Sequence, residues 1–215
     1  MTNNQATKKP TEINLQTEIE IIFHSEYAIN LIEGTPKKDN EKSFFIIGLI
    51  GFSSKLKLIK RDLDKKNPYA RFYFDESIKK YETAKKLINQ VNTECDHKIK
   101  EASDNGLGIL EATSLKPEKR KFNFSVSLCY KIALLLKEYD HCIRKLQPLK
   151  EMDFISGREL NRKVNSMSKS LRQLFHSAEL YNSTPLTIND LQIGNDKAIK
   201  AESLMGRLPG HEQAN

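Results

Sequence analysis

Apolar and polar residues alternate along two separate stretches of the chain, and this pattern predicts two β-strands. The first stretch is residues 13–23, and the second is residues 119–126. Successive side chains of a strand point to opposite faces, so each expected strand has one buried side and one solvent-facing side. The solvent-facing side of the second strand carries Lys121, Asn123 and Ser125.

Elsewhere, apolar residues recur at intervals of three and four, which is the spacing of an amphipathic helix. Asn67-Pro68 separates two of these helices, and Pro148 ends a third. Ser156 and Glu159 form the pattern of a capping box at the start of the last long helix. The fold class predicted from these elements is α+β, mainly α. The expected helices are residues 25–33, 44–65, 69–99, 127–147 and 156–175.

The same patterns divide the chain into four portions. Residues 1–12 are polar and contain a proline, so we expect an arm that buries too little apolar surface to become ordered. Residues 13–115 form a strand-plus-long-helices portion, and residues 116–181 contain one strand followed by two helices. Residues 182–215 form a C-terminal extension with a short apolar helix candidate. The Ser-, Asn- and Gly-containing residues 102–117 mark the boundary between the two large portions.

Charge is concentrated in one of these portions. The chain has 215 residues, 38% of them hydrophobic, and a net charge of +7. Residues 119–176 contain thirteen Lys or Arg and five Asp or Glu, a surplus of +8, so the remainder sums to about −1. A basic surplus confined to one segment is the electrostatic footprint of a unit that binds a polyanion such as nucleic acid.

The second expected strand has no sequence neighbour to pair with, and this predicts dimerisation. Pairing with the same strand of a second chain removes the exposed backbone edge. The order of strand, helix and capped helix resembles a ribbon-helix-helix unit, in which a dimeric two-stranded ribbon enters the DNA major groove. Under this interpretation Lys121 contacts guanine, Asn123 contacts adenine, and Ser125 contacts either type of base.

Phosphate contacts are expected where the last long helix begins. The free amides at a helix N-terminus and the positive end of the helix dipole favour an anion there. The residues expected to contact phosphate are Lys119, Arg120, Ser156, Gly157, Arg158, Arg162 and Lys163. The simpler alternative is that these groups are only the solvated face of an edge strand and a well-capped helix end.

Four segments of the chain carry a resemblance to a known family. They are LQTEIEIIFHSEYAINLIEG at residues 15–34, residues 47–70 with GLIGFSSKLKLI and NPYA, YDHCIR at 139–144, and MGRLP at 205–209. In this order they resemble the AcaB family of conjugation-associated proteins, which conjugative plasmids and integrating conjugative elements carry. The resemblance implies a dimeric, sequence-specific DNA-binding activator of conjugative-transfer control genes. Its partners would be double-stranded DNA, a second copy and another transcription protein.

The sequence contains no pattern typical of a metal site, a cofactor site or an enzyme. None of the five histidines stands in an HxxxH or HExxH arrangement, and the three cysteines form no CxxC pair. A P-loop, a dinucleotide-binding glycine pattern and a nucleophile elbow are also absent. The longest apolar run, residues 44–52, is too short to cross a bilayer, and no signal-peptide core precedes it. We therefore expect a cytoplasmic protein without membrane contact, cofactor or catalysis.

Two other functions fit the same sequence. The first is a scaffold of the conjugation machinery, whose long helices present a basic face to an acidic protein. The second is RNA binding, which usually requires exposed aromatic rings for base stacking. Because Phe122 and Phe124 are expected to point inward, RNA binding is the weaker alternative.

Overall fold

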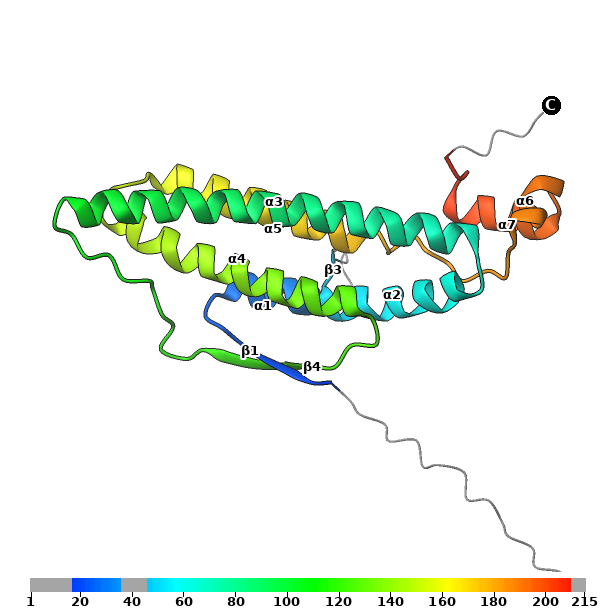
Figure 1. Cartoon of the computed structure of the whole chain (residues 1–215), viewed down its shortest axis with the longest axis horizontal. Coiled ribbons are helices and arrows are strands. Elements are labelled where there is room, and N and C mark those ends of the chain that lie inside the picture. Colours follow the sequence, from blue (N-terminus) through cyan, green and yellow to red (C-terminus); the bar gives the residue numbers. More distant parts are fainter. Residues whose placement is uncertain (1–16, 36–45, 210–215) are drawn as a thin grey trace, which may run out of the picture.

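The structure, a computed structural model, describes residues 17–35 and 46–209. Within these residues it is an elongated bundle of helices with a two-stranded ribbon along one side (Figure 1). This arrangement confirms the expected α+β, mainly α class. The expected arm at residues 1–12 and the start of the first expected strand lie outside the described residues. The elements in chain order are β1 Ile19–Phe23, α1 Glu26–Glu33, β2 Gly34–Thr35, β3 Ile46–Ile47, α2 Leu49–Asp64, α3 Pro68–Asp104, β4 Glu118–Phe122, α4 Ser127–Glu151, α5 Gly157–His176, α6 Ile188–Ile193 and α7 Asp196–Met205.

The long helix α3 forms the spine of the bundle and packs against both α4 and α5. Residues such as Tyr81, Ala84, Ile88 and Val91 recur at helical spacing and are buried on the face toward these neighbours. Since α3 comes from residues 13–115 and α4 and α5 come from residues 116–181, both portions share one hydrophobic core. Among the described residues, no helix combines the length and the apolar character that crossing a membrane requires.

The start of α3 follows the predicted junction. The Asn67 side chain accepts a hydrogen bond from the Ala70 N–H at 3.1 Å, and Pro68 lies in the first turn, where its missing N–H costs nothing. The helix continues five residues beyond the predicted end at Ile99, because no glycine or proline interrupts it before Gly106. Gly106 has a φ of 82°, a backbone conformation that favours glycine and stops the helix.

The prediction that Pro148 ends its helix is wrong, because α4 continues through this proline to Glu151. Proline has no N–H, so the carbonyl of Arg144, four residues earlier, loses its donor within the helix. The Ala112 N–H, in the connection between α3 and β4, donates to that carbonyl at 2.9 Å. In return, Arg144 Nε donates to the Ala112 carbonyl at 2.8 Å. A neighbouring segment thus replaces the missing bond, and the connection is fixed on α4.

The start of α5 lies where the capping pattern predicts it. Ser156 Oγ accepts a hydrogen bond from the Glu159 N–H at 3.1 Å, which is one half of a capping box. The Glu159 carboxylate faces Lys163 at 3.7 Å. Its charge still lies in the first turn of the helix, where the positive end of the dipole stabilises it.

The premise that the second strand lacks a partner within the chain is wrong. β4 pairs with β1 in antiparallel orientation, with Ile19 opposite Phe122 and Phe23 opposite Glu118. The ribbon is therefore complete in one chain, and β4 needs no second copy to cover this edge. The strand also ends at Phe122 rather than at residue 126, because the Phe124 N–H is bound by the Tyr130 hydroxyl at 2.9 Å.

The small sheet of β2 and β3 joins α1 to α2 through two glycines in close contact. A Cβ atom on Gly48 would lie 2.4 Å from the Gly34 nitrogen and 2.5 Å from the Ile32 carbonyl oxygen. Gly34 itself has a φ of 75°, which strains any residue with a Cβ atom. The close approach of α1 and α2 therefore depends on glycine at both positions.

Near the start of α3, the NPYA segment holds the C-terminal part of the chain. The Tyr69 hydroxyl donates to the Gly206 carbonyl at 2.8 Å, and Asn67 Nδ2 donates to the Thr184 carbonyl at 2.6 Å. Tyr69 is 2% exposed, so its ring also contributes apolar contact at this junction. Two of the segments that carry the family resemblance, NPYA and MGRLP, are thus joined by a hydrogen bond.

Candidate nucleic-acid interface

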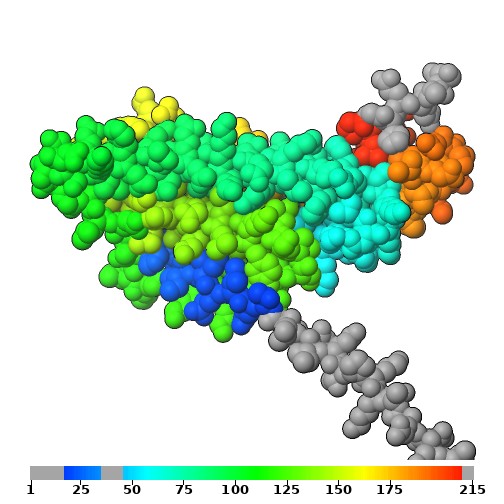
Figure 2. Space-filling view, viewed as in Figure 1, coloured from blue at the N-terminus to red at the C-terminus, as the bar shows by residue number. Residues whose placement is uncertain are grey.

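The outer face of the ribbon carries two cations and two anions. Lys119 and Lys121 on β4 are well exposed, and they lie 4.0 Å from Glu20 and Glu18, respectively. Ile22, which lies opposite Lys119, adds an exposed apolar side chain between these charges. Figure 2 shows β1 on the surface of the molecule, where a partner can reach it. The face is therefore accessible, but its net charge is zero.

The three residues expected to read bases lie together at one end of the ribbon. Lys121 belongs to β4, and Asn123 and Ser125 follow on the connection to α4; all three are exposed. In the register of the ribbon, Asn123 follows the last paired residue by one position. Phe122 is buried and Phe124 is half-buried, and the two rings stack 5.4 Å apart. The alternation that predicted a polar outer side thus extends beyond the strand itself.

Arg120, expected to contact phosphate, points to the other face of the ribbon. Its guanidinium Nη2 lies 2.5 Å from Glu33 of α1 and 2.6 Å from Glu118 of β4. Its Nε atom is buried and has no hydrogen-bond partner in the described part of the chain. Two carboxylates therefore offset the charge of Arg120, and the ion pair with Glu33 joins the ribbon to α1.

The remaining expected phosphate contacts lie on α5, away from the ribbon. Ser156, Gly157, Arg158 and Arg162 are exposed at the start of this helix. Lys163 is different, because its side chain is only 12% exposed and forms ion pairs with Glu94 of α3 and with Glu159. The hydrogen bond from Lys163, followed by that from Gln90, holds the pKa of Glu94 below its ordinary value, in keeping with a structural ion pair. Lys163 thus joins α5 to α3.

The structure does not bring the two groups of predicted residues together. The ribbon packs on α4 and is tied to α1, whereas α5 lies beyond these two helices (Figure 1). Contact of a duplex with the outer face of the ribbon therefore does not by itself bring the duplex to the start of α5. The base-reading and phosphate-binding assignments remain predictions for two separate surfaces: the ribbon, which carries Lys119 beside Lys121, and the start of α5.

The exposed face of α5 continues the basic character of its first turn. Lys169 and Arg172 are exposed and follow Arg158 and Arg162 at helical spacing, opposite the buried residues of the helix. We define these four residues as the α5 stripe. The sequence interpretation counted Lys169 and Arg172 in the basic segment 119–176 but assigned no DNA contact to them. Their separations from Arg158, eleven and fourteen residues, are the signal that could have identified them, because both separations return to the same helix face.

A groove of about 520 Å³ runs beside the C-terminal half of the α5 stripe. Ile46 and Ile47 of β3 form an apolar wall on one side, and Lys169 and Arg172 lie on the other side. The remaining lining residues are polar or charged: Asn165, Gln173, His176 and Glu179.

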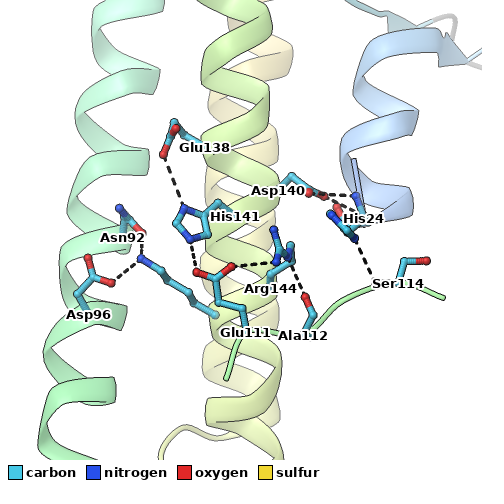
Figure 3. A network of polar contacts seen from close by, with 12 residues as sticks. His24, Asn92, Asp96, Glu111, Ala112, Ser114, Glu138, Asp140, His141 and Arg144 are labelled. Atoms are coloured by element: carbon cyan, nitrogen blue, oxygen red, sulfur yellow. Dashed lines mark hydrogen bonds and ion pairs between the residues drawn. The ribbon is translucent and has the colours of Figure 1, made fainter. Parts of the chain in front are cut away.

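A partly buried polar network fixes the connection between α3 and β4 on the bundle (Figure 3). Glu111 hydrogen-bonds His141 and forms an ion pair with Arg144 at 3.0 Å. The Ser114 N–H donates to His24 Nδ1 at 3.3 Å. Nearby, the Asp140 carboxylate accepts the backbone N–H groups of His24 and Ser25, at 3.0 and 2.8 Å.

Each of these polar groups therefore has a partner that explains its presence structurally. Across the described residues, no cluster of three or more His, Cys, Asp or Glu side chains is suitable for a metal ion. We interpret the network as a structural clamp, because it joins residues far apart in the sequence and positions the turn between β1 and α1.

Comparisons with known proteins identify the scaffold. A family model described as transcriptional regulator AcaB matches residues 13–211. The crystal structure of selenomethionine-containing AcaB from uropathogenic E. coli is similar, with a TM-score of 0.61 and 10% identity, over 91% of this chain and 92% of that chain. At this identity the similarity establishes the fold alone. No curated protein matches the chain. The family model covers most of the length, and the chain therefore belongs to the AcaB family of transcriptional regulators.

Proposed function

We propose that this chain regulates transcription by binding double-stranded DNA in a sequence-specific manner. The observation that carries the proposal is the two-stranded ribbon, whose outer face is open to solvent and ends in Lys121, Asn123 and Ser125. A two-stranded ribbon has the width of the major groove, where the edges of the four base pairs differ. In this arrangement a single chain supplies a whole ribbon, so a homodimer inserts two ribbons into successive half-sites.

The ion pairs on the ribbon are compatible with this role. Lys119 and Lys121 are exposed and only 4.0 Å from their glutamate partners, so each pair contributes about 0–1 kcal/mol. A lysine can therefore exchange its glutamate for a guanine edge or a phosphate at little cost. Asn123 is suited to adenine, because its amide NH₂ can donate to N7 while its amide oxygen accepts from the N6 amino group in the same plane.

The resemblance to the family supports two further parts of the proposal. We propose that the protein is an activator and that its targets are control genes for conjugative transfer. A reporter gene placed behind the promoter region of those genes tests both parts. We expect transcription to rise when the chain is expressed; a fall would identify a repressor at the same site.

Fluorescence anisotropy with a promoter duplex and a scrambled duplex tests sequence-specific binding. We expect Asn123→Ala to lose about 1–3 kcal/mol of discrimination, or roughly 5- to 150-fold, on the promoter duplex alone. Asn89→Ala, at an exposed position on α3, is the matched control and should bind as the unaltered chain does. Equal weakening on both duplexes would contradict base reading by Asn123. No preference of the unaltered chain for the promoter duplex would instead favour the scaffold function.

A further inference from the structure

We infer that the α5 stripe binds the phosphate backbone of double-stranded DNA, and that Lys169 and Arg172 extend this contact along the whole helix. The inference rests on the proposed function, because it names a second surface through which the regulator holds DNA. It follows from the lack of net positive charge on the ribbon, where Glu18 and Glu20 offset Lys119 and Lys121. A face with no net charge adds little electrostatic affinity for a polyanion. Most DNA-binding proteins require that electrostatic affinity.

The α5 stripe is cationic, and a carboxylate that interacts with it, Glu94, is ion-paired to Lys163 while also feeling the charge of Arg162. In the described part of the chain, none of Arg158, Arg162, Lys169 and Arg172 has a carboxylate within 4.0 Å. Glu159 forms an ion pair with Lys163, and Glu179 hydrogen-bonds His176. Four cations thus face solvent with no anion at ion-pair distance among residues 17–35 and 46–209.

The dimensions of the α5 stripe suit a DNA backbone. From Arg158 to Arg172 the helix rises by about 21 Å, at roughly 1.5 Å per residue. Along the duplex axis this length covers about six base-pair steps, at roughly 3.4 Å each. Exposed Asn165 lies between the two pairs of cations and offers an amide donor for a phosphate oxygen.

The groove beside the α5 stripe adds a shape that matches a backbone. Lys169 and Arg172 line one side of it, and the apolar wall of Ile46 and Ile47 lines the other. A sugar–phosphate chain presents both features, because its sugars are partly apolar and its phosphates are anionic. The contact is independent of sequence, since it involves no base edges.

Salt-dependent binding of the full chain to a duplex tests this inference. The variant Lys169→Ala/Arg172→Ala is compared with Lys86→Ala/Lys100→Ala, which removes the same charge from exposed positions on α3. For each protein, anisotropy gives the dissociation constant on promoter and scrambled duplexes between 50 and 200 mM salt. Circular dichroism checks that both variants remain folded, as expected for exposed side chains.

We expect the slope of log affinity against log salt to become shallower by about 1.8 for the α5 variant, at roughly 0.9 for each lost phosphate contact. The change should be equal on both duplexes, and the control should keep the slope of the unaltered chain. Equal slopes for the α5 variant and the control would overturn the inference while leaving DNA binding intact. Failure of the unaltered chain to bind either duplex would overturn the proposed function as well.

Discussion

Asp140 connects α4 to the turn between β1 and α1, and we expect its replacement to destabilise the whole bundle. Its side chain is almost completely buried, and its two carboxylate oxygens accept the N–H groups of Ser25 and His24 at 2.8 and 3.0 Å. Asparagine has the same shape but places an NH₂ group where one oxygen was. Asp140→Asn therefore removes one hydrogen bond and leaves one buried N–H facing a donor.

The magnitude follows from these two losses. A hydrogen bond to a charged group contributes about 1.5–3 kcal/mol, and an unsatisfied buried donor costs about 1–3 kcal/mol. Both values describe the same pair of facing groups, so they are not simply added. We expect Asp140→Asn to lower the free energy of unfolding by about 2–4 kcal/mol. Asp140→Ala removes both bonds and leaves a cavity, so its effect should be larger, at about 3–5 kcal/mol.

Urea unfolding followed by circular dichroism measures this change. With an m-value of about 2–3 kcal/mol/M, the unfolding midpoint should fall by roughly 1 M for Asp140→Asn. The matched control is Asp75→Asn, which removes an exposed ion pair with Arg71 and should cost less than about 0.5 kcal/mol. Similar midpoints for the two variants would refute the assignment of Asp140 as the link between α4 and the turn.

Four further predictions follow from other contacts. Gly48→Ala should destabilise the fold by about 1–3 kcal/mol in urea unfolding, because its Cβ atom would collide with the backbone of Gly34; a neutral effect would contradict this close packing. Pro148→Ala restores an N–H that competes for the Arg144 carbonyl, so the Ala112 amide should exchange hydrogen faster; unchanged exchange would contradict the docking of this connection. Tyr69→Phe should cost about 1 kcal/mol in thermal unfolding through loss of the bond to Gly206, and no loss would show that the hydroxyl contributes nothing. At pH 8 a disulfide reagent should label the native thiols only at the rate of unfolding, because burial raises their pKa values far above 8, and fast labelling would contradict their burial. These thiols are Cys95, with a pKa of about 11, and Cys129 and Cys142, each with a pKa of about 12.

Helices could be predicted from the sequence wherever a local signal marks their ends. Asn67-Pro68 and Ser156 act within four residues, so the starts of α3 and α5 can be identified without any knowledge of the fold. The end of α4 could not be predicted in this way. Pro148 ordinarily stops a helix, but here the Ala112 N–H, from a segment far away in the sequence, satisfies the carbonyl that the proline leaves unpaired.

The ribbon shows a second limit of local patterns. Alternation identified both β1 and β4, yet about ninety residues separate Phe23 from Glu118 and no pattern relates one strand to the other. The pairing depends on tertiary contacts, such as the Asp140 clamp on the turn after β1 and the ion pair between Arg120 and Glu33. The exposed charge on α5 could be predicted from the sequence for the same reason that the helix could. The ion pairs that offset Arg120 and Lys163 could not be predicted, because they depend on tertiary contacts.

The segments that carry the family resemblance meet one another in the structure. Gly34 contacts Gly48, Asp140 binds the turn at Ser25, and Tyr69 binds Gly206, so each segment joins elements of the scaffold. Neither β4 nor the α5 stripe belongs to these segments. The family model spans residues 13–211, so family membership accounts for the bundle and for the class of function. Asn123 and the four side chains of the α5 stripe are exposed, so the proposed DNA contacts predict that exchanging them between family members alters DNA binding without altering the fold.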